Sequence, residues 1–205
     1  MFKDYSVTLK GLAPLLMHNG RLNDKRDPFA IELSRCVKLG KKSEDMTLRS
    51  EDVEWAGGLY HTGSATIQEG VVTFAADARV IVPADNLWAC TVEGATVCRM
   101  GKAMQSALII EDDPVLNYDG PKDLNKLLLS PAHKSRKRVG IKGSGVMRTR
   151  PMFRSWAITF VAAIEVEQID PDALRAALSD AGARKGLGDW TPRYGRFELS
   201  EMKEA

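Results

Sequence analysis

Hydrophobic and polar residues alternate along two stretches of the chain, which is typical of β-strands with one buried face. In the first stretch, Tyr5, Val7 and Leu9 alternate with polar residues, and an apolar run over 12–16 leads to a bend at 18–20. In the second stretch, which begins near residue 152, five apolar residues share one face: Trp156, Ile158, Phe160, Ala162 and Ile164. Because the opposite face is also partly apolar, we predict that this second strand lies inside a sheet.

Apolar residues at spacings of three and four predict helices over 29–39, 52–60, 86–104 and 170–182. Asp85 or Asn86 is expected to cap the third helix, because a side-chain oxygen there can accept from free backbone N–H groups. Asp170 followed by Pro171 is a strong start for the fourth helix. Shorter β-rich segments are expected within 71–82, 107–110 and 196–199.

With two long excursions set aside, the predicted elements follow the order βαββαβ. This order is typical of α+β proteins in which two helices cover one face of a sheet, as in ferredoxin-like and RNA-recognition (RRM-like) domains. We therefore expect a single RRM-like domain over residues 1–205, with insertions at about 20–80 and 119–150. The pattern does not define the structure of region 20–66.

Composition narrows the class of protein. The chain has 205 residues, of which 44% are hydrophobic, enough for a core of its own. The charged, alternating start is unlike a leader peptide, and no apolar run is long enough to span a bilayer, so we expect a cytoplasmic protein without a membrane partner. The three cysteines, Cys36, Cys90 and Cys98, form no CxxC pair and predict buried free thiols. We expect no metal or cofactor.

Charge is strongly segregated, although the net charge is only +2. The stretch from Leu124 to Ile164 contains no Asp or Glu, and the rest of the chain therefore carries a net charge of −7. Nine cations fall in this stretch: Lys126, Lys134, Arg136, Lys137, Arg138, Lys142, Arg148, Arg150 and Arg154. A basic segment on an acidic body favours binding to a polyanion; the alternative is a solvated face with ordinary lysines.

Two features of the basic stretch suggest how it would bind. The glycine-rich segment around 140–145 predicts a mobile loop or an extended hairpin. If the segment that follows is extended, Arg148, Arg150 and Arg154 point to one side about 7 Å apart, a spacing that matches successive phosphates.

A second candidate element is the segment KGLGDWTPRYGRFEL, residues 185–199. Glycines there would let backbone N–H groups approach a phosphate, and nearby cations would add charge. Trp190 and Tyr194 are candidates for stacking on bases, although for Trp190 packing as an anchor is the stronger interpretation. The other residues assigned to this site are Arg184, Lys185, Gly186, Gly188, Arg193, Gly195 and Arg196.

These features resemble the RAMP superfamily of CRISPR-associated RNA-binding proteins, most closely its backbone subunits. The similar parts are the βαββαβ order, the glycine loop, the segment IVPADNL at 81–87, and the basic insertion at 119–150, where those subunits carry a thumb hairpin. The segments MHNGR, MRTRPMFRSW and GLGDWTPRYGRF are also similar to those of small phage and prophage proteins, which implies a bacterial host cell. The resemblance implies single-stranded nucleic acid held along a sheet face and a glycine loop, often in head-to-tail filaments.

We therefore expect a sequence-tolerant binding protein for single-stranded RNA or DNA that self-associates and is not an enzyme. One alternative is a metal-independent endoribonuclease, because some RAMP-type nucleases use a histidine near the first strand, where His18 lies. No second base or oxyanion donor is recognisable for it. The other alternative is a phage structural or assembly protein whose basic excursion contacts an acidic partner.

Overall fold

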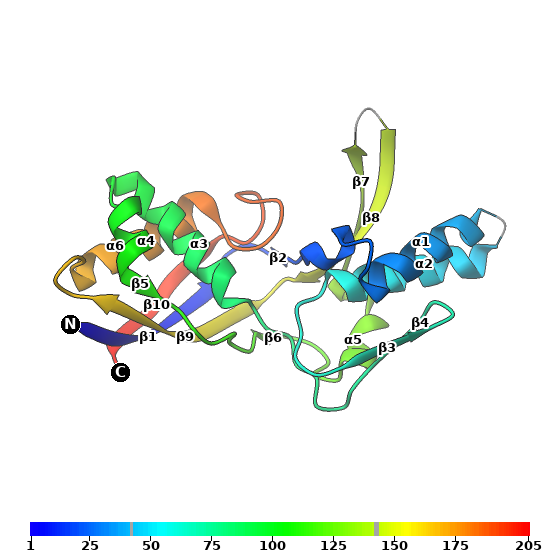
Figure 1. Ribbon diagram of the computed structural model, residues 1–205, viewed down its shortest axis with the longest axis horizontal. Coiled ribbons are helices and arrows are strands. Elements are labelled where there is room, and N and C mark those ends of the chain that lie inside the picture. Colours follow the sequence, from blue (N-terminus) through cyan, green and yellow to red (C-terminus); the bar gives the residue numbers. More distant parts are fainter. Residues whose placement is uncertain (42, 142–143) are drawn as a thin grey trace. The chain divides into compact units, whose positions relative to one another are not determined.

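The computed structural model describes residues 1–41, 43–141 and 144–205 as a mixed α+β protein with antiparallel sheets (Figure 1). The chain divides into two compact units. Unit 1 comprises Met1–Leu15, Ile81–Asp119 and Phe153–Ala205, and unit 2 comprises Leu16–Val80 and Gly120–Met152. The two stretches that we expected as insertions thus supply most of one compact unit.

The sheet of unit 1 is antiparallel, with the strand order β10–β1–β9–β5, and β6 also pairs with β9. In its middle, Val7 lies opposite Phe160 on one side and Met202 on the other. The internal position predicted for the strand with the two apolar faces is confirmed. The strands are β1 (Phe2–Gly11), β5 (Leu108–Ile109), β6 (Asn117–Tyr118), β9 (Trp156–Glu165) and β10 (Phe197–Glu204).

Three helices lie on one side of this sheet: α3 (Ala84–Ala95), α4 (Gly101–Ala107) and α6 (Pro171–Asp180) (Figure 1). The start of α6 is as predicted, because the Asp170 carboxylate accepts from the N–H of Asp172 and Pro171 occupies the first turn. Gly94 allows α3 to approach α6 closely, since a Cβ there would lie 2.1 Å from the carbonyl oxygen of Ala177.

The prediction of one helix over 86–104 was wrong. A 3₁₀ turn, η2 (Thr96–Cys98), and Arg99 at φ 60° separate α3 from α4. The predicted cap was also wrong, because Pro83 occupies the N-cap position and no side chain there makes a capping bond. Instead, the carboxylate of Asp113 accepts from the N–H of Ala84 at 2.8 Å.

Unit 2 contains a pair of long helices, three short helical segments and two hairpins. Trp55 is fully buried at its centre and donates its indole N–H to the carbonyl of His133 at 2.8 Å. The three-stranded sheet of this unit has the strand order β2–β8–β7. The elements are β2 (Leu15–Leu16), η1 (Gly20–Asn23), α1 (Pro28–Gly40), α2 (Glu44–Gly58), β3 (Ala65–Gln68), β4 (Val71–Phe74), α5 (Leu124–Leu128), η3 (Pro131–His133), β7 (Lys134–Ile141) and β8 (Ser144–Phe153).

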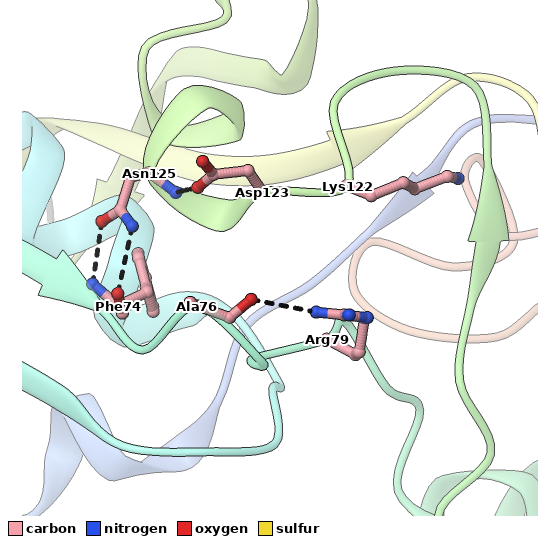
Figure 2. Close-up of a pocket in the computed structure, with 6 residues that line it drawn as sticks. All are labelled: Phe74, Ala76, Arg79, Lys122, Asp123 and Asn125. Atoms are coloured by element: carbon pink, nitrogen blue, oxygen red, sulfur yellow. Dashed lines mark hydrogen bonds between the residues drawn. The ribbon is translucent and has the colours of Figure 1, made fainter.

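A small pocket of about 240 Å³ lies where α5 meets β4 (Figure 2). The side chain of Asn125 accepts from the Phe74 N–H at 2.8 Å and donates to the Phe74 carbonyl at 3.0 Å. Asp123 caps α5, and the Arg79 guanidinium donates to the carbonyls of Ala76 and Ala78. The Asn125 bonds therefore join α5 to β4, whereas the Arg79 bonds stay within the segment 76–79.

Across the described parts of the chain, no helix is both long and apolar enough to cross a membrane.

Candidate nucleic-acid interface

The basic stretch forms an extended hairpin, β7–β8, that projects from the rest of unit 2 (Figure 1). Of the two structures that we considered for this stretch, the hairpin is the one observed. Lys137 lies opposite Arg148, and Ser135 lies opposite Arg150. Because opposite residues of an antiparallel pair share a face, Lys137, Arg148 and Arg150 lie on the same face of the hairpin.

Acidic residues of α2 bind the base of this hairpin. Lys134 Nζ lies 2.5 Å from the Asp52 carboxylate, and Arg136 lies 2.7 Å from that of Glu51. Arg148 donates to Glu54 Oε1 at 2.8 Å.

Glu54 is buried, and its second oxygen, Oε2, accepts from the backbone N–H of Thr149 at 2.8 Å. A buried carboxylate that receives two such bonds is well compensated for its lost hydration. The three ion pairs therefore fix the base of the hairpin and neutralise three of the cations that we assigned to the binding site.

The distal hairpin, residues 137–140 and 145–147, has a different surface. The Arg138 guanidinium lies across Gly145, since a Cβ at residue 145 would be only 1.9 Å from Arg138 Nε. Met147 lies opposite Arg138 and is exposed on the same face, whereas Val146, opposite Val139, is exposed on the other face. Lys142, also assigned to the site, lies outside the described residues. Cations next to exposed apolar side chains are a surface suited to a chain of phosphates and bases.

The predicted row of three arginines along one extended strand, Arg148, Arg150 and Arg154, is not observed. Arg150 is half-buried, and the three residues after it, 151–153, are buried. Strand β8 ends at Phe153, so Arg154 lies exposed in the bend that follows. With Arg148 paired to Glu54, strand periodicity does not align three arginine side chains for phosphates.

The glycine loop at 185–196 in unit 1 is closed on itself. The N–H of Leu187 donates to the Gly195 carbonyl, and the N–H of Gly195 donates to the Pro14 carbonyl, both at 2.9 Å. A Cβ at Gly195 would lie 1.7 Å from the Leu187 carbonyl oxygen, and one at Gly186 would lie 2.7 Å from that of Tyr194. These two glycines therefore allow the ends of the loop to meet, which is a different role from admitting a phosphate.

The two aromatic residues of the loop lie close together, and Tyr194 differs from its predicted role. Leu187 and Tyr194 are the buried side chains, whereas Trp190 is half-buried and adopts φ 58°. The Trp190 and Tyr194 rings lie 6.2 Å apart, and the Arg193 guanidinium lies 5.9 Å from the centre of the Tyr194 ring. Burial of Tyr194 makes it an anchor of the loop, so we do not assign it to base stacking.

Two arginines near the loop make contacts within unit 1. Arg184 pairs with Asp180 at 3.0 Å, and Arg196 Nε donates to the Pro192 carbonyl at 2.9 Å. Lys185 is half-buried, and Gly188 adopts φ 85°.

Burial raises the pKa of the Cys90 thiol to about 12, which keeps it protonated to donate to the Gly186 carbonyl at 3.3 Å. Of the other two cysteines, Cys36 is buried, as predicted. Cys98 is exposed, so the prediction of a buried thiol was wrong at that position.

The uncovered face of the unit 1 sheet has a mixed surface without a concentration of cations. Its centre holds Ser6, Val161 and the hydroxyl pair Thr8 and Thr159, whose oxygens lie 3.0 Å apart. Glu198 and Glu201 lie opposite Lys10 and Thr8 on the same face. The same face also carries Lys10, Lys203 and the exposed ring of Phe2, so acidic, basic, hydroxyl and apolar side chains are mixed on it.

The histidine of the alternative hypothesis, His18, lies half-buried near the start of unit 2. Its carbonyl accepts from the Tyr60 hydroxyl at 3.3 Å. This bond involves the backbone of His18 and not its ring, so the nuclease hypothesis stays a prediction.

A second histidine in unit 2, His61, is more tightly enclosed. Its Nδ1 lies 2.9 Å from the Thr62 carbonyl, and its ring stacks edge-on against Phe74 at 5.1 Å. Nε2 is buried and has no hydrogen-bond partner among the described residues. Burial, with a smaller contribution from the charge of Arg21, therefore lowers the pKa of His61 below its ordinary value of 6.5.

Acidification is expected to destabilise unit 2 through His61. Because the pKa is lower in the folded state, the unfolded chain binds more protons, and stability falls as the pH drops through about 6.5. Thermal unfolding measured between about pH 8 and about pH 5 should show a smaller loss of stability in His61→Gln than in the wild type, because the glutamine side chain does not titrate. An equal loss in both proteins would assign the effect to other groups.

Within the described residues, no group of three or more His, Cys, Asp or Glu side chains is placed to hold a metal ion. Comparisons with protein-family models and with curated proteins find no match to this sequence.

Proposed function

We propose that the protein binds single-stranded nucleic acid through the distal hairpin, with little dependence on sequence. The observation that carries this proposal is the division of charge along β7–β8. Acids of α2 hold the base of the hairpin, while farther out Arg138 shares one face with exposed Met147, and Val146 is exposed on the other face. A rigid base with a cationic, partly apolar end suits contact with a flexible polyanion whose bases are unpaired.

We further propose that unit 1 is a ferredoxin-like, RRM-like sheet with its helices in the order βαββαβ. Support comes from the antiparallel order β10–β1–β9–β5, with α3 between β1 and β5 along the chain and α6 between β9 and β10. A relation to RAMP backbone subunits remains a proposal that rests on this order and on the hairpin in the second insertion. In this arrangement the main binding surface is the hairpin and not the uncovered sheet face, where Glu198 and Glu201 offset the lysines.

Titration of labelled single-stranded RNA, single-stranded DNA and duplex with the protein tests the proposal. Both single strands should bind, and duplex should bind more weakly, because the exposed apolar side chains contact only unpaired bases. With two to four phosphates contacted, log K should fall against log[salt] with a slope of about −1.4 to −2.8. Absence of binding at low salt, or affinity that does not change with salt, would refute the proposal.

The same samples distinguish the two alternatives. RNA that stays intact after incubation, or cleavage that persists in His18→Ala, would reject the endoribonuclease. An assembly protein that recognises an acidic partner protein would instead show no oligonucleotide binding while remaining folded.

A further inference from the structure

Helix α1 carries an exposed apolar stripe that the proposed function does not use. Ile31 and Leu39 are 55% and 45% exposed, at positions eight residues apart on one helix face. Together with Leu22 and Ala30 they line a groove of about 740 Å³ in unit 2. Aliphatic side chains in a hollow of this size indicate a surface for a protein partner.

The charges around this groove are positive. Lys25 and Lys38 line it and are exposed. The third cation, Arg35, already pairs with Glu32 through two bonds, of 2.8 and 2.5 Å. The groove therefore favours an occupant with exposed aliphatic and acidic side chains.

A surface of that composition exists on unit 1 of the same chain. A pocket of about 520 Å³ on the uncovered sheet face is lined in part by Val115 and Val161, which are 55% and 47% exposed. Asp112 lines the same pocket, and Glu111 is exposed next to it. This surface is aliphatic at its centre and acidic at its edge, so it is complementary in charge and similar in polarity to the α1 groove.

We propose that the α1 groove of one copy of this chain docks on the acidic sheet-face pocket of a second copy. Lys25 and Lys38 would lie against Glu111 and Asp112, with the aliphatic side chains of both surfaces buried between the copies. The two surfaces differ, so the contact is heterologous, and each copy carries one surface of each kind. This proposal stands apart from nucleic-acid binding, because it uses neither the distal hairpin nor a polyanion.

Charge reversal with complementation tests this contact. Sedimentation velocity of nuclease-treated protein should show concentration-dependent association that weakens with salt. The variants K25E/K38E and E111K/D112K should each associate at least about tenfold more weakly, because each opposes like charges. An equimolar mixture of the two should recover association, since the altered groove of one variant then meets the altered pocket of the other.

Matched variants with reversed charges outside both surfaces, K41E/K102E and D77K/E93K, should associate like the wild type. Circular dichroism checks that every variant is folded, and oligonucleotide binding by both interface variants should stay at the wild-type level. A protein that remains monomeric at all concentrations would overturn the proposal. So would association that the interface variants leave unchanged, or a mixture that does not recover it.

Discussion

A variant with Lys137→Glu and Arg138→Glu is expected to bind a single-stranded oligonucleotide about a hundredfold more weakly than the wild type at low salt. Arg138 lies in the distal hairpin, and Lys137 begins it, directly opposite Arg148, which α2 binds through Glu54. Reversal removes two cations from the surface and places two acids against the phosphates. The salt dependence should change too, with a slope smaller in magnitude by about 1.4, because two fewer counterions are released.

The control for this variant is Lys41→Glu with Lys102→Glu, which makes the same change in net charge at exposed positions outside the hairpin. Fluorescence anisotropy across several salt concentrations measures both affinity and slope. If the control loses as much affinity as the hairpin variant, binding reflects overall charge and not the hairpin. If neither changes, the site lies elsewhere on the protein.

Gly195→Ala is expected to lower the stability of the protein by about 3 kcal/mol, the largest effect of any glycine substitution in the loop. At φ 72°, residue 195 has a backbone conformation that is unfavourable for alanine. In addition, the new methyl would lie 1.7 Å from the Leu187 carbonyl oxygen, so the hydrogen bond from the Leu187 N–H to residue 195 could not keep its geometry. Thermal unfolding followed by circular dichroism should show a midpoint lower by on the order of 10 °C.

Gly20→Ala provides the comparison, because no atom lies within 4 Å of a Cβ at residue 20. We expect its unfolding midpoint to stay close to that of the wild type. If Gly195→Ala unfolds at the same temperature as Gly20→Ala, the loop is not closed in the way that the structure shows.

Local sequence patterns predicted the elements that depend on neighbouring residues. The alternation around Trp156 predicted β9, and Asp170 with Pro171 predicted the start of α6, because periodicity and capping act over a few residues. The same reasoning failed between Thr96 and Arg99, where tertiary structure breaks a helix that the apolar spacing would continue.

The parts of the candidate site that the sequence did not predict depend on distant residues. Glu54 and Arg148 are 94 positions apart, and no local pattern indicates that a helix near residue 50 neutralises the base of a hairpin near residue 140. The glycines of the C-terminal loop were identified correctly as unusual. Their purpose follows from the carbonyls of Leu187 and Tyr194 that they approach, which only the folded chain reveals.

The carboxylates of α2 also determine which residues of β7 and β8 lie opposite each other. Glycine-rich hairpins are prone to slip in register, because few side chains specify one pairing over the next. A slip of one residue in β8 would turn Arg148 to the opposite face and leave the buried Glu54 without its two donors, an arrangement that is strongly unfavourable. Helix α2 thus acts as a template for the alignment of the hairpin, so that a single arrangement of its cations faces the solvent.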